Sequence, residues 1–575
     1  MIKYGLDGTE RPKGEKMKKL FEKFKESGLL GKVILSLICG SAAGFILFYI
    51  FLPPINLQSV GFWLYLTAVI ACYSLPFLGI KVNEYVEITK RASGTKKKKN
   101  KIDVKYNKWA LVAVAIPVTV IILGLLISSE IFNAHAYARV IEVTESSFTD
   151  DLPESSEVTN IALMDTQSAT ALGNKELGSL ADMVSQFVLS EYYTQINYKR
   201  TPKKVSNLEY DGFFKWIGNR DSGIPGAVLV DPVKNDAEYL EFDEPIIYVE
   251  SGYFGDDLER KLRFEYPTKI FDSITFELDE EGNPYYIVSC SRPQVALFGA
   301  SDVEEVIIFD PTDGSSELMA VENAPAWIDV VYTGDLAFTK YNWHGTLSGG
   351  FFNSIIGNVG CKMATDDFGY IVIEDDVWYF TGVTSVVSND LSNIGFILSN
   401  ARTGEYKFYS VIGAEEHSAM AAAEGEVQEK GYEASFPSLI NVAGQPTYIM
   451  VLKNAAGVVE LYALVNVENY SLVATGNTQA EAMSSYKKLL RLNNVDTGAS
   501  DKIATVTVEN VRVATVSGIS TVYITSTSGK VYKGYLETDE ALMLIRVGDV
   551  LEVSYTEGEI NGLYSISEWK FASSQ

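Results

Sequence analysis

The hydrophobic positions of this chain change character along its length. Three long apolar runs lie in the first quarter, at Val33–Leu52, Gly61–Ile80 and Trp109–Ser129, and none contains Asp, Glu, Lys or Arg. A bilayer core about 30 Å thick needs roughly 20 apolar residues of helix to cross it. A helix of a soluble protein is seldom apolar all round over that length. The pattern therefore predicts three transmembrane helices.

After residue 130 the apolar positions come in short runs that are rich in β-branched and aromatic residues. Runs of this kind, separated by turn residues, are typical of antiparallel strands. Gly, Asn and Pro in the connecting segments favour the tight turns of hairpins. Four hairpins are predicted, over residues 273–290, 305–321, 395–411 and 447–467.

Helical patterns are fewer in this part of the chain. Leu208–Asn219 is predicted to be a helix that ends before the breaker at Gly223. Thr478–Leu492 is predicted to be another, because Thr478 followed by Glu481 forms a capping box. Ala414–Gln428 is rich in alanine, which favours helix. Its small side chains suit either a helix that lines a binding groove or one that packs closely on a sheet.

The last 75 residues look separable from the rest. A polar linker at residues 493–500 precedes five alternating segments, predicted as strands at Ile503–Val511, Thr521–Thr527, Val531–Glu537, Val550–Tyr555 and Leu563–Lys570. Five short strands of this kind are typical of a small barrel like the OB fold. An OB fold often binds single-stranded nucleic acid through a basic groove, which this segment lacks, so a ligand or protein contact or a structural cap remains.

The predicted fold class is α+β: a three-helix transmembrane anchor, then a β-rich multi-domain ectodomain that ends in a small OB-like β-barrel. The region after the third apolar run is too long for one ordinary domain. The predicted bounds are a basic leader (1–32), the anchor (33–129) with a basic loop (81–108), a spacer (130–160), two α+β modules (161–330 and 331–495) and the barrel (501–575).

Charge predicts the orientation of the anchor. Residues 1–108 hold 19 Lys and Arg against 8 Asp and Glu, whereas the whole chain holds 48 against 74. The basic residues lie in the leader and in the 81–108 loop, and the connection around Pro53–Val60 has none. The positive-inside rule therefore places the N-terminus in the cytoplasm and residues 130–575 outside the cell membrane.

The acidic remainder also limits the partners. It carries 29 Lys and Arg against 66 Asp and Glu, the difference between the two sets above. A nucleic-acid partner is not expected, because it requires a basic footprint. Repulsion from anionic lipid further predicts an ectodomain that stands away from the membrane surface.

The three runs contain no ionisable residue of the kind that marks ion or proton pathways. In the first run Ser36, Gly40 and Gly44 recur every four residues, which makes a small-residue face that permits close helix approach. Two interpretations stay open: this face packs against the other two spans, or it joins copies in a homo-oligomer.

Residues with catalytic chemistry are sparse. The chain has three histidines, and no HExxH, CxxC, GxSxG or Walker pattern occurs. No catalytic or cofactor-binding residue is therefore assigned, and no cofactor is expected. His344 and Cys361 are either a base and nucleophile pair or a loop histidine and a structural thiol. Cys290 and Cys361 either form a disulfide in the oxidising exterior or are two free thiols.

Acidic residues flank one predicted strand, as Asp366-Asp367 before it and Glu374-Asp375-Asp376 after it. Several carboxylate oxygens in one place suit calcium, although the regular calcium-loop spacing is missing. The alternative is a solvated acidic face, so metal binding stays open.

Two turns carry a family resemblance. Asp310–Ser315 and Arg402–Glu405 resemble the "DPxTGE"-like turn of the PepSY family, extracytoplasmic modules in which this turn joins two strands beside a helix. Gly212–Asn219, Tyr266–Asp272 and Gly413–Gly425 are similar to segments of uncharacterised Gram-positive membrane proteins, some of them labelled colicin-production-type. That group brings no activity that can be carried over to residues of this chain.

The resulting expectation is a non-enzymatic, membrane-anchored binding or scaffold protein of the cell envelope. Its partners would be the lipid bilayer, an envelope protein or wall polymer, and a second copy of the chain. One alternative is an envelope hydrolase that uses carboxylates in an inter-domain cleft. The other, which the resemblance implies, is a PepSY-like regulator of an envelope protease.

Overall fold

The computed structural model describes residues 29–77, 79–87, 97–105, 108–152, 154–155, 163–164, 166–180, 183–373, 375–386, 392–455, 457–493, 502–516, 519–536, 539–557 and 562–572. The basic leader predicted at residues 1–32 therefore lies mostly outside the described residues.

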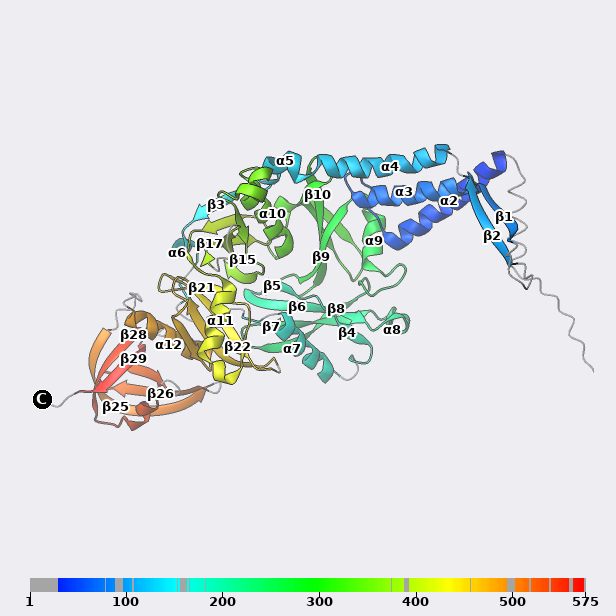
Figure 1. Cartoon of the computed structure of the whole chain (residues 1–575). Helices are drawn as coiled ribbons and strands as arrows, with labels where there is room; N and C mark the ends of the chain where they lie inside the picture. Colours follow the sequence, from blue (N-terminus) through cyan, green and yellow to red (C-terminus); the bar gives the residue numbers. More distant parts are fainter. Residues whose placement is uncertain are drawn as a thin grey trace, which may run out of the picture.

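The three apolar runs form helices that lie side by side in Figure 1, α2 (Leu29–Phe51), α3 (Val60–Ser74) and α4 (Lys108–Ile127). They are long and apolar enough to cross a membrane, with α3 extended by the 3-10 turn Leu75–Phe77. The second run was predicted to stay helical to Ile80, and this boundary is wrong. The helical segment ends at Phe77, and β1 (Gly79–Glu87) pairs instead with β2 (Lys97–Lys105).

The small-residue face of α2 is occupied by α3 of the same chain. The Ser36 hydroxyl donates a hydrogen bond to the Tyr73 carbonyl at 2.5 Å. A Cβ placed on Gly40 would lie 2.2 Å from the Tyr73 ring, so the glycine is what admits the ring. A Cβ on Gly44 would meet Tyr65 and Val69 at an ordinary 3.7 Å. Of the two interpretations, the structure has packing between spans.

The β-rich part of the chain after the apolar helices repeats one order of elements four times, a helix followed by an antiparallel sheet. Unit 1 consists of α7 (Thr166–Ser179) with β4 (Phe187–Leu189), β5 (Thr194–Tyr198), β6 (Thr201–Tyr210), β7 (Ile224–Asp231) and β8 (Asp236–Ile246). Unit 2 consists of α9 (Leu258–Glu265) with β9 (Ile270–Leu278), β10 (Pro284–Val295), β11 (Gly299–Phe309) and β12 (Ser316–Ala320).

Units 3 and 4 follow the same order. Unit 3 consists of α10 (Gly334–Leu347) with β13 (Lys362–Ala364), β14 (Gly369–Ile373), β15 (Asp376–Ser385), β17 (Gly395–Asn400) and β18 (Tyr406–Tyr409). Unit 4 consists of α11 (Glu416–Glu426) with β20 (Glu433–Ala434), β21 (Ser438–Val442), β22 (Gln445–Lys453), β23 (Val459–Asn466) and β24 (Val473–Gly476). All four predicted hairpins lie in these sheets and are confirmed.

The same turn recurs in all four units, between the last two strands of each that are given above. An Asp or Asn at this point accepts hydrogen bonds from backbone N–H groups two or three residues ahead, which is the chemistry of an Asx turn. The four acceptors and their distances are Asp231 (3.0 and 2.9 Å), Asp310 (2.8 Å), Asn400 (2.9 and 2.8 Å) and Asn466 (2.7 Å). Two of these turns carried the sequence resemblance.

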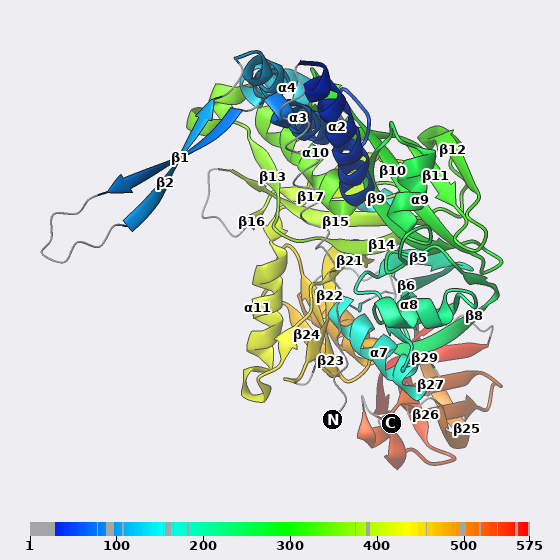
Figure 2. The same cartoon turned by 90° about the vertical axis from the view of Figure 1, so that its right-hand side faces the viewer.

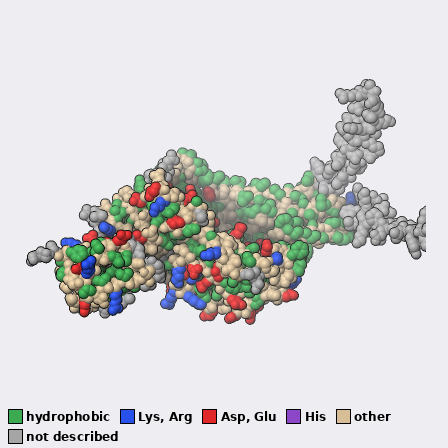
Figure 3. All heavy atoms as spheres, turned by 90° about the horizontal axis from the view of Figure 1, so that it is seen from below, with side chains coloured by type: hydrophobic (Ala, Val, Ile, Leu, Met, Phe, Trp, Pro, Cys, Tyr) green, Lys and Arg blue, Asp and Glu red, His purple; other side chains and the backbone are tan. Residues whose placement is uncertain are grey.

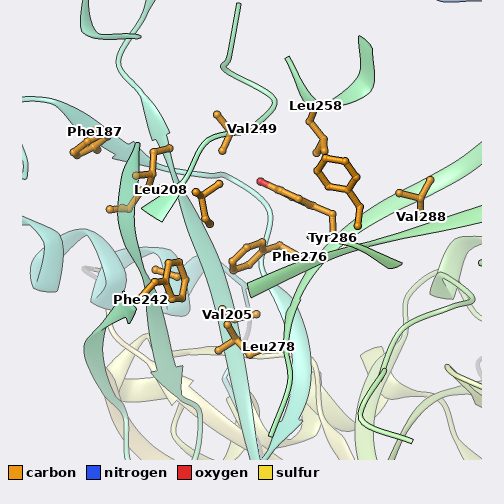
Figure 4. Close-up of a cluster of buried hydrophobic side chains, with 14 of the residues drawn as sticks. Phe187, Val205, Leu208, Phe242, Val249, Leu258, Phe276, Leu278, Tyr286 and Val288 are labelled. Atoms are coloured by element: carbon orange, nitrogen blue, oxygen red, sulfur yellow. The ribbon is translucent and has the colours of Figure 1, made fainter. Parts of the chain in front are cut away.

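The sheets pack in pairs. Units 1 and 2 enclose one core, in which Figure 4 shows Phe242 of unit 1 close to Phe276 and Tyr286 of unit 2. Units 3 and 4 enclose a second core around Phe380 and Tyr448. Helices cover the remaining faces, α7 on unit 1, α10 on unit 3 and α12 (Gln479–Leu492) on unit 4. Each pair is thus a two-layer sandwich that buries its apolar strand faces.

Two predicted helices are confirmed and one is wrong in part. In α12 the Glu481 N–H donates to the Thr478 hydroxyl at 3.1 Å, as a capping residue requires. The alanine-rich segment forms α11, with Ala419 and Ala423 fully buried against the sheets. Leu208–Tyr210, however, is the end of strand β6, and the helix there is α8 (Phe213–Asn219). Strand pairing with β4 decided this, since Leu208 faces Leu189.

The predicted spacer at residues 130–160 is wrong, because much of it is structured. It contains α5 (Glu130–Tyr137), β3 (Val143–Ser146) and α6 (Phe148–Asp151). Strand β3 pairs in parallel with β18, and Phe148 is buried in the core of units 3 and 4. The polar composition concealed a strand whose partner lies far along the chain. Residues 156–160 lie outside the described residues.

The C-terminal segment closes into a barrel with its own core. Its strands are β25 (Lys502–Val516), β26 (Ile519–Ser526), β27 (Val531–Tyr535), β28 (Val550–Glu557) and β29 (Leu563–Phe571), ordered 25-26-27-29-28 around the barrel. All five predicted strands are therefore confirmed. Figures 1 and 2 place this barrel at the end of the molecule farthest from the anchor.

The ectodomain lies directly against one end of the helical bundle. The Ser128 hydroxyl at the end of α4 accepts from the N–H groups of Leu297 and Phe298, at 3.1 and 2.9 Å. The Ile55 N–H between α2 and α3 donates to the Pro267 carbonyl at 2.6 Å. Charge had predicted an ectodomain that stands away from the membrane surface. Instead, short-range packing and hydrogen bonds hold it at the ends of the spans (Figures 1 and 3).

The α2–α3 contact gives a matched pair of variants. Gly40→Ala is expected to destabilise the protein by about 1–3 kcal/mol, because the added methyl overlaps the Tyr73 ring in a packed contact. Gly44→Ala is expected to be nearly neutral, because its methyl meets neighbours at contact distance. Thermal unfolding of the full chain in detergent micelles measures both, and equal midpoints would contradict the packing described.

Candidate functional site

His344 and Cys361 each contact a different backbone carbonyl. The His344 Nδ1 lies 2.9 Å from the Ala138 carbonyl, whereas the Cys361 thiol donates to the Thr346 carbonyl at 3.3 Å. Neither group is aimed at the other as a base and nucleophile would be. The contacts of Cys361 fit a structural thiol, but His344 lies in the last turn of helix α10 and not in a loop, so that part of the prediction is wrong.

Cys290 and Cys361 are both free, as are Cys39 and Cys72. Cys290 lies on β10 in the core between units 1 and 2, where burial raises the pKa of its thiol to about 12. Cys361 precedes β13 and is contacted by Asn353 in unit 3. The candidate disulfide is therefore absent from this structure, because the fold buries the two thiols in different units.

The acidic residues considered for calcium lie at opposite ends of β14. Asp366 and Asp367 precede this five-residue strand and Asp375 and Asp376 follow it, so about 15 Å separates the two sets. Asp376 accepts hydrogen bonds from Arg402 at 2.7 and 2.9 Å. Glu374 lies outside the described residues. Among the residues described, no group of three or more metal-ligating side chains occurs.

A pair of carboxylates does lie where unit 2 approaches unit 3. Glu277 on β9 is fully buried and accepts from the N–H groups of Asp329 and Val330, at 2.7 and 3.0 Å. Asp329 is 6% exposed and accepts from the Asn197 N–H at 2.8 Å. Burial raises the pKa of Asp329 to about 7, and burial followed by repulsion from Asp329 raises that of Glu277. This junction is sealed from solvent rather than open as a cleft.

A cavity of about 450 Å³ lies where α9 and the end of β6 meet the membrane helix α2. We call it the juxtamembrane pocket. Its lining residues come from three segments distant in sequence: Tyr49, Tyr210, Gly212, Glu250, Ser251, Gly252, Tyr253, Phe254, Asp257 and Arg260. Neither the anchor nor the ectodomain forms it alone.

Arg260 joins the two parts of this pocket. Its guanidinium lies 4.5 Å from the centre of the Tyr49 ring, a cation–π contact, and its Nε donates to the Tyr49 carbonyl at 3.4 Å. Asp257 pairs with it at 3.2 Å, and the Phe254 carbonyl accepts from it at 2.9 Å. Phe264, one turn further along α9, packs edge-on against Phe48 of α2.

Ser251 in the pocket lining is bound by Glu209, which lies near the end of β6. Glu209 accepts hydrogen bonds from the Ser251 N–H at 2.9 Å and from the Ser251 hydroxyl, and burial raises its pKa. Tyr210 is 3% exposed, and its hydroxyl has no hydrogen-bond partner among the described residues. Glu250 lies at the rim, and its pKa is raised by burial and then by repulsion from Glu209 and other nearby carboxylates.

An exposed apolar surface borders the pocket. We call it the aromatic ridge, and its members are Phe213, Phe214, Ile217, Phe254 and Phe264. The ring of Tyr253 joins ridge and pocket, at 5.0 Å from Phe213 and 5.3 Å from Trp216. In Figure 1 α8 lies below the end of α2 that is next to α9.

Sequence reasoning did not find this site. Gly212–Asn219 carried a similarity to other membrane proteins and was not predicted to be an exposed surface. The apolar cluster Phe213-Phe214 and Trp216-Ile217 is nevertheless visible in the sequence. Glu250, Asp257 and Arg260 have no motif spacing. Their relation to Tyr49 exists only because α9 folds against α2, about 210 residues away in sequence.

Comparisons with known proteins give little. No protein-family model matches the chain, and no curated protein matches it. One similar solved structure is oligopeptidase B from Leishmania major, with a TM-score of 0.14 and 10% identity, covering 85% of this chain and 59% of that chain. The chain thus spans about three fifths of that enzyme's length, and a similarity of this size carries no argument about fold or activity.

The buried carboxylate pair gives a pH prediction. Asp329 has a pKa of about 7 in the folded state and about 3.9 when unfolded, so the folded state holds the extra proton between these values. The stability linked to this proton is complete below about pH 4 and is lost as the pH rises towards 7. We expect the free energy of unfolding to fall by a few kcal/mol over this range.

Asp329→Asn is expected to remove much of the fall in the free energy of unfolding between pH 4 and 7. The amide oxygen still accepts the hydrogen bond from the Asn197 N–H, but the amide does not titrate. Thermal unfolding of the full chain in micelles from pH 4 to 7.5 measures it. Asp221→Asn, at a fully exposed aspartate, is the matched control and should keep the wild-type slope. An unchanged slope in the Asp329 variant would refute the assignment.

Proposed function

We propose that this chain is a membrane-anchored, extracytoplasmic binding or scaffold protein of the cell envelope that engages a protein partner or wall polymer. Its N-terminus and the 81–108 loop lie in the cytoplasm, in agreement with their lysine content. Residues 130–575 lie outside. The observation that carries the proposal is the junction of ectodomain and anchor, where both parts build one pocket.

This junction supports a platform rather than a tethered domain. Hydrogen bonds reach from Ser128 to the β10–β11 hairpin and from Ile55 to the segment before β9. Aromatic contacts add Phe264 on α2. Contacts at several helix ends restrict tilting of unit 2, so the units are presented at a fixed distance from the bilayer, as a scaffold requires.

The repeated units support an extracytoplasmic module of the PepSY type. Each has a helix, an antiparallel sheet and an Asx turn before the last strand, at Asp231, Asp310, Asn400 and Asn466. The C-terminal barrel supports an OB-type assignment through its parallel β27–β29 pair and its closed 25-26-27-29-28 order. Both resemblances favour recognition of other molecules over catalysis.

Among the described residues, the one buried carboxylate pair considered for the hydrolase alternative does not have the geometry that this activity needs. Glycan hydrolysis uses two carboxyl groups that flank a substrate in a cleft. The carboxylate pair at the junction of units 2 and 3, Glu277 and Asp329, is 0% and 6% exposed and is satisfied by backbone N–H groups. These two carboxylates are better explained as a structural pair.

The proposed function predicts a cross-linked partner. We expect amine-reactive cross-linking of intact cells, followed by purification of the full chain, to recover an envelope protein, a wall fragment or a second copy. The control is the anchor alone, residues 1–129, which should recover none of these. Recovery of an un-cross-linked monomer, together with hydrolysis of peptide or glycan by the purified chain, would refute the proposal in favour of the enzyme.

Orientation and the aromatic ridge are tested by one labelling series. With a membrane-impermeant maleimide on intact cells, Tyr192→Cys should be labelled and Lys99→Cys should require permeabilisation. Phe214→Cys should be labelled several-fold more slowly than Tyr192→Cys, although the Phe214 and Tyr192 side chains are 84% and 77% exposed. The reason is that the aromatic ridge rests in the outer leaflet, at the depth where aromatic residues concentrate. Labelling of Lys99→Cys in intact cells would reverse the topology, and equal rates at 214 and 192 would exclude the ridge from the bilayer.

A further inference from the structure

An exposed apolar surface lies on unit 3, on the segment that joins α10 to β13. We call this segment, residues 351–360, the apolar loop. Four of its side chains are large, apolar and exposed: Phe352 (72%), Ile355 (59%), Ile356 (80%) and Val359 (80%). Large apolar side chains exposed singly are common on protein surfaces, whereas a group of them within eight residues forms a patch, and such patches mark interaction sites.

The fold holds these side chains on an ordered turn. The loop contains a π-helical turn, Asn353–Gly357, a rare element that is frequent at functional sites. The Asn353 side-chain amide donates to the Val359 carbonyl at 3.0 Å, and its oxygen accepts from the Val359 N–H at 3.1 Å. The Cys361 thiol then joins the end of the loop to the Thr346 carbonyl of α10. A surface that is ordered in advance loses less entropy when it binds.

The loop is also free of charge in an acidic chain. Residues 341–361 contain no Asp, Glu, Lys or Arg, whereas residues 109–575 hold 66 Asp and Glu against 29 Lys and Arg. Another uncharged run, residues 435–452, forms the buried strands β21 and β22, so its composition is explained by burial. Burial does not explain the composition of the apolar loop, because its large side chains are exposed.

The loop lies beside the segment that leaves the membrane helices. A Cβ on Gly350 would lie 4.0 Å from Nε2 of His135 in α5, and Phe351 packs against the apolar cluster that includes Ala134. Helix α5 starts three residues after α4 ends, and in Figure 1 it lies beyond that end of α4, on the side away from β1 and β2. The contacts with α5 therefore hold the apolar loop outside the spans, at a fixed height above them.

The area of this surface suits a protein partner. Ile131 and Phe132, about one turn before His135 on α5, are 50% and 66% exposed and extend it. With the four side chains of the apolar loop they expose on the order of 600 Å² of apolar surface, at roughly 150 Å² for a fully exposed side chain of this size. A specific interface takes about 800 Å² from each partner. These six residues would thus supply most of one side of such an interface.

Charge and membrane attachment favour a second copy of the chain as this partner. Two copies of an acidic chain repel each other, and like charges that face each other across an interface are strongly unfavourable, so an uncharged surface is where they can meet. The same helices hold each copy in the same orientation, so both loops stand at the same height above the bilayer. A two-fold rotation about the bilayer normal then places loop against loop, as in an isologous dimer.

We propose that the apolar loop of unit 3, together with Ile131 and Phe132 of α5, is the contact through which two copies of this chain form a two-fold dimer in the membrane. The inference deepens the proposed function by naming one partner of the scaffold, and it rests on that function for membrane anchoring alone. It holds for either orientation of the anchor.

The first test is cysteine cross-linking of the full chain in isolated membranes, with copper phenanthroline as the oxidant. A disulfide requires Cα atoms within about 7 Å, and a residue near a two-fold axis meets its own copy at such a distance. We expect at least one of Phe352→Cys, Ile355→Cys, Ile356→Cys and Val359→Cys to form a disulfide-linked dimer. The wild type, whose four cysteines are free, and Val458→Cys, exposed on unit 4, are the controls and should stay monomeric on a non-reducing gel.

The second test measures the dimer itself, as the mass of the full chain in dodecyl maltoside by light scattering over a range of concentrations. Ile356→Asp should raise the dissociation constant at least tenfold, because two carboxylates would face each other near the axis. Val458→Asp is the matched control and should dissociate as the wild type does. Equal thermal unfolding midpoints for the two variants show that the fold is kept, which is expected because both positions are exposed.

The outcomes separate the possible occupants of the loop. Loop disulfides together with weaker association of Ile356→Asp support the dimer. A monomeric wild type with no loop disulfide overturns it, as does a loop cysteine that cross-links to a different protein. Maleimide labelling of Ile356→Cys as slow as that of Phe214→Cys, in a monomer, assigns the loop to lipid and also overturns the dimer. None of these failures refutes the proposed function, which fails only if the chain is an un-cross-linked monomer that hydrolyses peptide or glycan.

Discussion

The contact between unit 2 and the ends of the three apolar helices is the constraint on which the rest of the molecule depends. Ser128 holds the β10–β11 hairpin, and Phe264 and Arg260 of α9 lie against Phe48 and Tyr49 of α2. These contacts override the electrostatic repulsion expected of an acidic ectodomain, because hydrogen bonds and ring packing act at contact distance whereas repulsion between solvated charges is screened within about 10 Å. They fix the position of unit 2 relative to the ends of the apolar helices.

Once unit 2 is fixed, pairing of the sheets fixes the others. Unit 1 shares its core with unit 2, and units 3 and 4 share theirs. Strand β3 follows α5 directly after the anchor and joins the sheet of unit 3 beside β18. The β-rich part of the chain is therefore connected to the bundle of apolar helices at two points, through unit 2 and through β3. The barrel has its own core and lies at the far end (Figure 1).

The carboxylates illustrate how the same residue type serves different ends. Glu277 and Asp329 are buried and accept hydrogen bonds from backbone N–H groups at the junction of units 2 and 3. Their burial makes the free energy of unfolding depend on pH. Glu250 borders a cavity, and repulsion from nearby carboxylates contributes to raising its pKa. The difference is access to solvent. An acidic composition alone says nothing about which carboxylates are buried and which border a cavity.

The sequence by itself determined the local features. The three apolar runs, the four hairpins, the capping box at Thr478 and the five barrel strands all depend on periodicity and turn chemistry within some 20 residues, and the structure has them. Tertiary structure decided the rest. The end of β6 became strand instead of helix through its partner β4, and residues 143–146 became strand through β18. The juxtamembrane pocket needed Tyr49, Tyr210 and Arg260 from three segments. No local pattern encodes such a meeting, because it is set by which apolar faces find each other across the whole chain.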